Sequence, residues 1–194
     1  MLTFQRLSGA ELERYIPELA RLRIRVFRDF PYLYEGDLAY EERYLQTYIQ
    51  GQGSVVVLAF DGDNIVGAST GLPLSQETDE VLQPFKGANL PIADIFYCGE
   101  SVLLQEYRGQ GAGVTFFNER EAHARELGCK WSCFCGVQRP DDHPMRPADF
   151  VPLDDFWRNR GYKKHPELAT TFSWKEIGEA YESPKPMTFW MKAL

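Results

Sequence analysis

Apolar side chains near the start of the chain recur every three or four residues, which is the spacing of one helical face. They are Leu12, Ile16, Leu19, Leu22, Val26, Phe27 and Phe30. Pro17 predicts a break near the first turn of this helix, and Pro31 predicts its end. A second helical run follows, with Asp37 placed to cap its start and Gly51 to close it. Its apolar positions are Tyr40, Tyr44, Leu45, Tyr48 and Ile49.

The period then changes to that of β-strands, with apolar runs separated by turn residues. The expected strands are residues 2–7, 54–60, 65–74, 95–104, 130–137, 170–174 and 187–192. The turn DGDN joins the second and third of them as a hairpin. Further helices are expected at 114–127 and 153–160. The order of strand, turn, helix and strand around residue 114 implies a parallel strand pair joined by a crossover helix, so the fold class is mixed α/β.

Composition indicates one globular unit. With 194 residues, 44% of them hydrophobic, the chain is long enough to bury the core of a single domain at 1–194. The formal charge of -7 argues against a nucleic-acid binder and favours a neutral or cationic partner. No run reaches the roughly 18 apolar residues of a membrane span, and the first residues lack the segments of a signal peptide. We therefore expect a cytoplasmic protein that binds neither nucleic acid nor a membrane.

The four cysteines are expected to be free thiols, because a reducing compartment disfavours disulfides. Cys133 and Cys135 lie two apart in an expected strand and would share one face. A zinc site needs C-x2-C or paired histidine spacing, and Cys129, Cys133 and Cys135 with the distant His123 do not supply it. No metal is expected.

The stretch EYRGQGAGVTFF at 106–117 places three glycines between a strand and a helix. Glycine inside an element costs roughly 0.5–1 kcal/mol relative to alanine, so such a run marks a backbone that turns tightly or approaches something closely. The start of a helix also offers unpaired N–H groups and the positive end of the helix dipole, which together favour a phosphate. The P-loop pattern is absent, and Val114 stands where the dinucleotide fingerprint needs its third glycine.

The pattern that fits is R-x-x-G-x-G, from Arg108 to Gly113, and it resembles the coenzyme A-binding segment of the GNAT superfamily of acetyl-CoA-dependent N-acetyltransferases. The order of expected elements agrees over most of the chain. FWRNRGY at 156–162 is similar to the aromatic-pair and glycine-aromatic signature of the family's next helix and strand. The resemblance implies the GNAT fold, a central and mostly antiparallel sheet with a parallel pair splayed around the acyl-CoA site and helices on both sides.

By this resemblance, acetyl-CoA is the acyl donor, and the turn and the preceding strand bind it. The pyrophosphate would lie on the amides of Gly109, Gln110, Gly111, Ala112, Gly113 and Val114. The pantetheine arm would pair like an added strand with Ser101, Val102 and Leu103. Arg108 would either add positive charge at the phosphates or brace the loop. A β-carbon on Gly111 or Gly113 would hold the phosphates away from the amides.

Acetylation of an amine needs a base more than an acid. Deprotonating an alkylammonium at pH 7 costs about 4.6 kcal/mol, whereas protonating the leaving thiolate involves only about 2 kcal/mol. Glu100 is the candidate base, because the family often places an acid on this strand; its alternative interpretation is an exposed strand residue. Tyr97 and His143 are the other options that we weigh for this role.

The usual general acid of the family is missing. Many members carry a tyrosine in an F-Y-x-x-x-G-[FY] pattern, and this chain has Trp157 at that position. An indole does not donate a proton to a thiolate, so Tyr162 or a water takes the role, or the role is absent. The departure leaves a second hypothesis, a protein that binds acyl-CoA without catalysing transfer.

Two segments are candidates for the acceptor site. Phe30, Tyr32 and Tyr34 lie beside Asp29 and Glu35, a mixture that suits a cationic amine but also suits packing between helices. The polar stretch at residues 75–94, with one short helix expected near 81–85, is an insertion relative to the family. It is either a lid over the acceptor side or surface decoration.

The sequence therefore predicts an acetyl-CoA-dependent N-acetyltransferase that acts on the primary amine of a small molecule. The alternatives are a non-catalytic acyl-CoA-binding protein and an enzyme that acts on a protein N-terminus or lysine. The oligomeric state is not fixed by the sequence, and a homodimer is one option.

Overall fold

The computed structural model describes residues 1–194 and contains one seven-stranded sheet in the order β1-β2-β3-β4-β5-β7-β6. The strands are β1 (Thr3–Leu7), β2 (Val55–Asp61), β3 (Asn64–Pro73), β4 (Ile95–Leu103), β5 (Trp131–Val137), β6 (Lys163–Trp174) and β7 (Ser183–Ala193). Neighbours pair antiparallel except β4 and β5, which are parallel. The predicted fold class and the parallel pair are thus confirmed.

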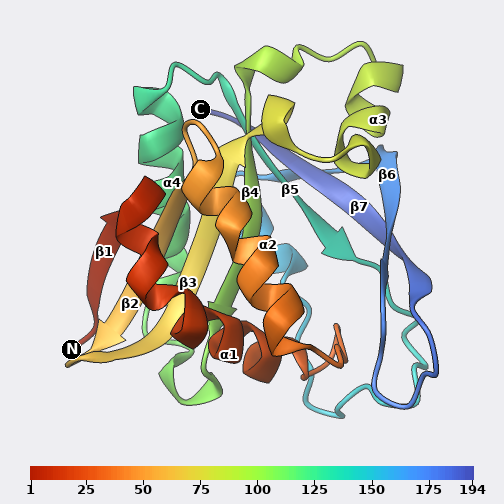
Figure 1. Ribbon diagram of the computed structural model, residues 1–194. Helices are drawn as coiled ribbons and strands as arrows, with labels where there is room; N and C mark the ends of the chain where they lie inside the picture. The colour runs from red at the N-terminus through yellow and green to blue at the C-terminus, as the bar shows by residue number, and fades with distance from the viewer.

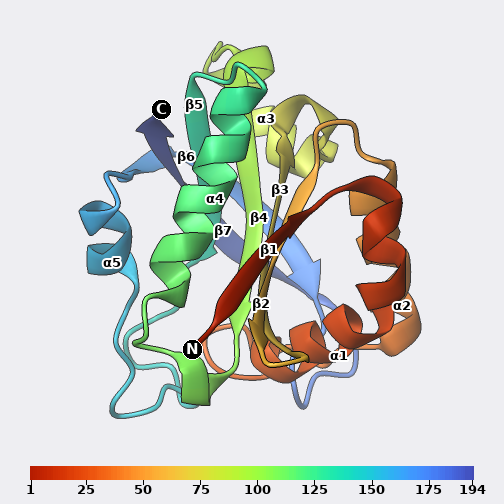
Figure 2. The same ribbon diagram turned by 90° about the vertical axis from the view of Figure 1, so that its left-hand side faces the viewer.

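Helices cover both faces of the sheet (Figures 1 and 2). The α-helices are α1 (Ile16–Phe27), α2 (Leu38–Gln50), α3 (Asp79–Gly87), α4 (Ala112–Glu126) and α5 (Asp154–Asn159). Short 3-10 helices are η1 (Gly9–Tyr15), η2 (Leu74–Gln76), η3 (Ile92–Asp94) and η4 (Gln105–Tyr107). Figure 2 shows α1 and α2 on one face of the sheet and α4 and α5 on the other. None of the helices combines the length and the apolar character that crossing a lipid bilayer requires.

The core lies in two layers, one on each face. Leu19, Leu45 and Tyr97 belong to the larger layer, beneath α1 and α2. Phe117 and Trp190 belong to the layer on the α4 side. Because successive strand residues face opposite sides of the sheet, β4 and β5 each contribute apolar side chains to both layers.

The parallel pair is short, and this shapes the middle of the sheet. Only the pairs Ile95 with Trp131, Phe96 with Ser132 and Tyr97 with Cys133 join β4 to β5. Beyond them β4 continues along β3 as far as Leu103, while β5 continues along β7. The two strands therefore diverge after Tyr97, as the splayed pair of the predicted fold requires.

A bulge in the pairing of β3 with β4 lies directly after this point. The register shifts between Ser69 and Gly71, so Gly99 and Glu100 together oppose Thr70. A β-carbon on Gly99 would lie 2.6 Å from the Tyr48 hydroxyl and 2.7 Å from the Thr70 Oγ1 atom. Glycine is needed there because the bulge turns both residues towards α2.

Most expected elements match the observed ones to within a few residues, including the cap of α2, where the Asp37 side chain accepts a hydrogen bond from the Tyr40 N–H. The last two strands are longer than expected. β6 begins at Lys163, whereas a strand was expected only from residue 170. β6 is an edge strand with a register shift between His165 and Ala169, so it lacks the apolar alternation of a buried strand.

Candidate functional site

The glycine turn forms the start of α4 and leaves its amides unpaired. Gly109 has a φ of 76° and Gly111 a φ of 87°, a region that residues with a β-carbon rarely adopt. The first helical bond runs from the Thr115 N–H to the Gly111 oxygen at 3.1 Å. The N–H groups of residues 109–114 donate to no acceptor in the protein. Unpaired amides and the positive end of a helix dipole are the features that an anion favours.

The third glycine has a different role from the first two. A β-carbon on Gly113 would lie 3.2 Å from the Phe156 ring of α5, whereas one on Gly109 or Gly111 would meet open space. Gly113 therefore allows α4 and α5 to approach closely. Arg108 braces the turn, since its Nε donates to the Leu103 oxygen at 3.2 Å and its guanidinium lies 3.7 Å from Asp29.

The strand predicted to bind pantetheine leads directly into this turn. Ser101, Val102 and Leu103 pair with β3 on one side only, because β5 has diverged from the other side of β4. The structure thus brings the predicted strand edge and the predicted anion site together, joined by η4. An extended ligand could pair along this edge as an added strand.

Comparison with known proteins identifies the fold. No protein-family model matches the chain, and no curated protein sequence matches it. Among solved structures, the ribosomal-protein-alanine N-acetyltransferase from Brucella melitensis is 16% identical, has a TM-score of 0.65 and is covered over 99% of both chains. An acetyltransferase of the GNAT family from Streptococcus pneumoniae is 12% identical, with a TM-score of 0.62 and full coverage of both chains. The chain has the GNAT fold.

A further structure with this fold was solved with its cofactor acetyl-CoA. This protein from Salmonella typhimurium is 9% identical, with a TM-score of 0.63, and the match covers all of this chain and 94% of the other. At such identities the likeness establishes the GNAT fold, and the chemistry has to be argued from the residues of this chain.

Glu100, the predicted base, lies in a buried cluster with Arg23 and Glu41. The Arg23 guanidinium of α1 donates to both carboxylates, and Arg23 is 8% and Glu41 1% exposed. The Tyr34 hydroxyl donates to Glu41 at 2.8 Å, and the Tyr44 hydroxyl donates to Glu100 at 3.3 Å. One guanidinium thus faces two carboxylates, and Glu100 is already the partner of a cation.

Tyr162, the predicted acid, lies in the other core layer. Its hydroxyl donates to Glu121 at 3.1 Å and is 2.7 Å from the Ser132 hydroxyl, in a residue that is 1% exposed. Burial, together with the nearby Glu121 carboxylate, raises the pKa of Tyr162 well above its usual value. The hydroxyl is therefore protonated at neutral pH. Its partners do not include any member of the Arg23 cluster.

Trp157 packs beside Tyr162 in the same layer. Its ring lies edge-on to Trp190 at 5.2 Å and to Phe134 at 5.0 Å. A β-carbon on Gly136 would lie 3.0 Å from the Trp157 ring, so the glycine makes room for the indole. The residue at the usual tyrosine position therefore acts as core packing in this protein.

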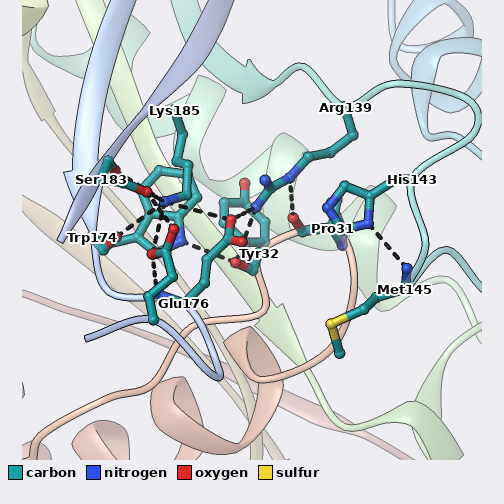
Figure 3. A network of polar contacts seen from close by, with 10 residues as sticks. Pro31, Tyr32, Arg139, His143, Met145, Trp174, Glu176, Ser183 and Lys185 are labelled. Carbon is teal, nitrogen blue, oxygen red and sulfur yellow. Dashed lines mark hydrogen bonds and ion pairs between the residues drawn. The ribbon is translucent and has the colours of Figure 1, made fainter. Parts of the chain in front are cut away.

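The aromatic residues predicted to bind the acceptor lie in the connection between α1 and α2. Phe30 packs edge-on against Phe150 at 4.7 Å, and Tyr32 packs against Trp174 at 5.9 Å. Tyr34 belongs instead to the Arg23 cluster. His143 lies 5.5 Å from Phe30, and its Nδ1 accepts from the Met145 N–H at 3.2 Å (Figure 3). His143 is thus held by its own loop.

A polar network fastens this connection to the end of the β6–β7 hairpin (Figure 3). Arg139, just beyond β5, donates to the Pro31 oxygen at 2.7 Å and forms an ion pair with Glu176. Trp174 donates from its indole to the Tyr32 oxygen at 2.9 Å. The α1–α2 connection is therefore bonded to two segments that lie more than one hundred residues later in the chain.

Lys185 closes the network from β7, where it is 4% exposed. Its ammonium lies 3.3 Å from Glu179 and 3.7 Å from Glu176. The Ser183 hydroxyl, the Glu176 N–H and Lys185 together lower the pKa of Glu179 to about 2. The network contains two cations and two anions and is electrically balanced.

Two surface hollows lie away from these residues. One of about 620 Å³ is formed by β1 and η1 around Gln5 and Arg14. The other, of about 250 Å³, lies between α1 and the β2–β3 turn around Arg21 and Asn64. Neither contains a residue of the glycine turn or of the Arg23 cluster.

Sequence reasoning missed two charged residues that lie beside Glu100, namely Arg23 on α1 and Glu41 on α2. In the sequence, Arg23 and Glu41 occupy positions of ordinary amphipathic helices, where a charge usually faces solvent. Only the folded structure shows that these charged side chains are buried, unlike the charged residues on the surface.

Proposed function

We propose that the protein is an acetyl-CoA-dependent N-acetyltransferase that acts on the primary amine of a small molecule. The observation that carries the proposal is the set of six unpaired amides at the start of α4, next to the edge of β4 that β5 leaves free. A diphosphate and an extended amide-bearing arm are the two parts of coenzyme A that these features fit. The GNAT fold of the chain supports the same interpretation.

The binding roles follow from these positions. The amides of residues 109–114 would hold the pyrophosphate, and Ser101, Val102 and Leu103 would hold the pantetheine arm. Arg108 would keep the turn in place through its bond to the Leu103 oxygen. When bound, acetyl-CoA supplies an activated acetyl group as a thioester. The protein contributes the orientation of that group at the point where β4 and β5 diverge.

The roles of Glu100 and Tyr162 stay predictions. Glu100 lies at the divergence of β4 and β5, which supports a place beside the acyl group. Its pairing with Arg23 makes its carboxylate a weaker acceptor for a proton, because a neighbouring cation favours the charged form. Tyr162 carries the proton that an acid needs, but its hydroxyl is bonded within the core.

A non-catalytic acyl-CoA-binding protein is the second candidate. Two observations favour it, namely the packing role of Trp157 and the ion pair on Glu100. A protein with this design would bind the coenzyme but would lack an acid and a free base at the expected positions.

Release of free thiol from acetyl-CoA, measured with a panel of primary amines and with peptides bearing a free N-terminus or lysine, tests the proposal. We expect release with small amines, and acetyl-CoA binding by calorimetry without any amine. Binding without thiol release for every acceptor would favour the non-catalytic candidate. Release with peptides alone would overturn the small-molecule assignment.

A further inference from the structure

Arg120 of α4 is a buried arginine that has no acidic partner. It is 2% exposed, and no carboxylate lies within ion-pair distance of its guanidinium. The neighbouring Glu121 pairs instead with Lys192 at 2.8 Å. A charge that leaves water without a counter-ion costs free energy, and an apolar side chain would fill the same space at a lower cost. The groups that the guanidinium contacts therefore have to account for its presence.

The partners of Arg120 are backbone carbonyls. Its Nη1 donates to the Thr70 oxygen at 3.2 Å and to the Glu100 oxygen at 3.0 Å, and its Nε donates to the Phe116 oxygen of its own helix at 3.2 Å. The guanidinium also lies 5.0 Å from the centre of the Phe117 ring. Hydrogen bonds from a charged donor are about twice as strong as neutral ones, so these contacts offset the burial of the charge.

The two strand carbonyls belong to the bulge between β3 and β4. Gly99 and Glu100 together oppose Thr70 there, and the Glu100 N–H donates to the Thr70 Oγ1 atom at 3.2 Å. A bulge interrupts the regular ladder of hydrogen bonds, so its backbone groups need other partners. Arg120 bonds to one carbonyl on each strand and thereby fixes the two strands relative to each other at the bulge.

Glu100 is held from both faces of the sheet. Arg120 donates to its carbonyl from the α4 side, and Arg23 of α1 donates to its carboxylate from the opposite side (Figure 2). The Tyr44 hydroxyl donates to the second carboxylate oxygen at 3.3 Å. The conformation of the bulge therefore depends on contacts from both layers of helices.

The bulge lies in the middle of the proposed site. On one side of it is the pair Tyr97 with Cys133, the last that joins β4 to β5, and on the other is the free strand edge at residues 101–103. Arg120 lies about two turns into α4, whose first residues carry the unpaired amides. One side chain thus connects the helix of the proposed phosphate site to the strand on which the acetyl group would lie.

We propose that Arg120 is a positioning residue for acyl transfer, which fixes the β4 bulge so that the thioester is presented to the amine in a productive orientation. This inference rests on the proposed function. Arg120 exchanges no proton and forms no bond with the reacting atoms, because a guanidinium stays charged at any working pH. Its contribution is orientation, and a displacement of about 1 Å can lower a rate about 100-fold.

Arg120→Met tests the inference, because it keeps a long side chain but removes the donors. We expect kcat to fall about 100-fold. The acetyl-CoA dissociation constant measured by calorimetry should stay close to that of the parent, because the amides of the glycine turn are untouched. Arg125→Met, on the same helix with a side chain that is 51% exposed, is the matched control and should behave as the parent.

Arg120→Lys keeps a cation without the planar fork of the guanidinium. It should recover part of the loss, with a kcat about 10-fold below that of the parent. This variant also carries the test if Arg120→Met does not fold. A kcat equal to that of the parent in either variant overturns the inference.

A loss of stability alone would not separate kcat from coenzyme affinity in this way. Leu7→Ala provides the control, because it removes a buried side chain of β1, three strands away from β4. It should lower the urea midpoint of unfolding and leave the kcat of the folded protein unchanged. An equal fall of kcat in Leu7→Ala and Arg120→Met overturns the inference.

Amide hydrogen exchange, measured by NMR without coenzyme, gives a readout that does not depend on turnover. In Arg120→Met the amides of residues 99–101 should exchange at least about 10-fold faster relative to those of the β1–β2 pairing, because the bulge has lost its charged donor. Unchanged relative rates overturn the inference. A parent that releases no thiol with any amine overturns the proposed function instead, and the exchange rates then still decide whether Arg120 holds the bulge.

Discussion

At the scale of single residues, Gly111 is the position in the turn where the backbone conformation most clearly requires glycine. Its φ of 87° is strained for any residue with a β-carbon, although the space around that position is open. We expect Gly111→Val to force the backbone out of this conformation, which costs about 1–2 kcal/mol, and to move the amides that face the anion site. The acetyl-CoA dissociation constant measured by calorimetry should rise at least about 10-fold.

Gly128 provides the matched control for this substitution. It has a φ of 80°, has equally open space around its β-carbon position and lies just beyond the other end of α4. Gly128→Val should lower stability to a similar extent without changing coenzyme affinity. Equal affinity of the Gly111→Val variant and the parent would contradict the anion site.

The glycine turn could be predicted from sequence because all of its parts are local. A strand, three alternating glycines and a helix start lie within about a dozen positions, so spacing alone defines the geometry. The cluster of Arg23, Glu41 and Glu100 could not be predicted, because its members lie 18 and 77 residues apart. No local pattern distinguishes a helix arginine that is buried between two carboxylates from one in water.

Between these cases lies Gly113, whose place was predicted but whose role was not. Its glycine pattern indicates close approach, and the approach in the structure is that of the Phe156 ring. The spacing of the glycines indicates that a β-carbon would not fit at this position, but it does not identify the neighbouring residue that the β-carbon would contact.

At the scale of elements, the Arg139–Glu176 pair joins the end of β5 to the β6–β7 hairpin and to the α1–α2 connection. Both side chains are close to nine-tenths buried, so removing one charge leaves the other without its partner. We expect Glu176→Gln to lower the free energy of unfolding by about 3 kcal/mol, the lower end for a broken buried pair. Urea unfolding monitored by tryptophan fluorescence measures the change.

An exposed glutamate of the same hairpin is the control. Glu167 lies on β6 with a side chain that is 65% exposed and pairs only with His165. Glu167→Gln should change the free energy of unfolding by no more than about 0.5 kcal/mol. If both variants unfold at the same urea concentration, the network of Figure 3 does not hold these segments together.

The extent of β6 could not be predicted because an edge strand receives its pairing from a partner rather than from its own pattern. Lys163 and Lys164 pair with Met191 and Trp190 of β7, whose apolar run was recognised. The length and register of β6 are thus determined by its pairing with β7. The polar residues at the start of β6 do not by themselves indicate a strand.

At the scale of the whole molecule, the continuous sheet makes the two core layers depend on each other. Each of the central strands contributes side chains to both layers, as Tyr97 and Cys98 do on β4. A separate unfolding of one layer would expose the other face of the same strands. We therefore expect a single cooperative thermal transition for residues 1–194, as predicted for one domain.

Acetyl-CoA should move this transition as a whole, because its proposed site is built from β4 and α4 at the centre of the sheet. At 100 times the dissociation constant, binding to the folded state alone adds about 2.7 kcal/mol. For a chain of this size that corresponds to an increase in Tm of roughly 5–10 °C. Calorimetric scans should show the full shift for the parent and for Gly128→Val, and a much smaller one for Gly111→Val at the same concentration. Two transitions, of which the coenzyme moves only one, would mean that the sheet does not couple the glycine turn to the rest of the chain.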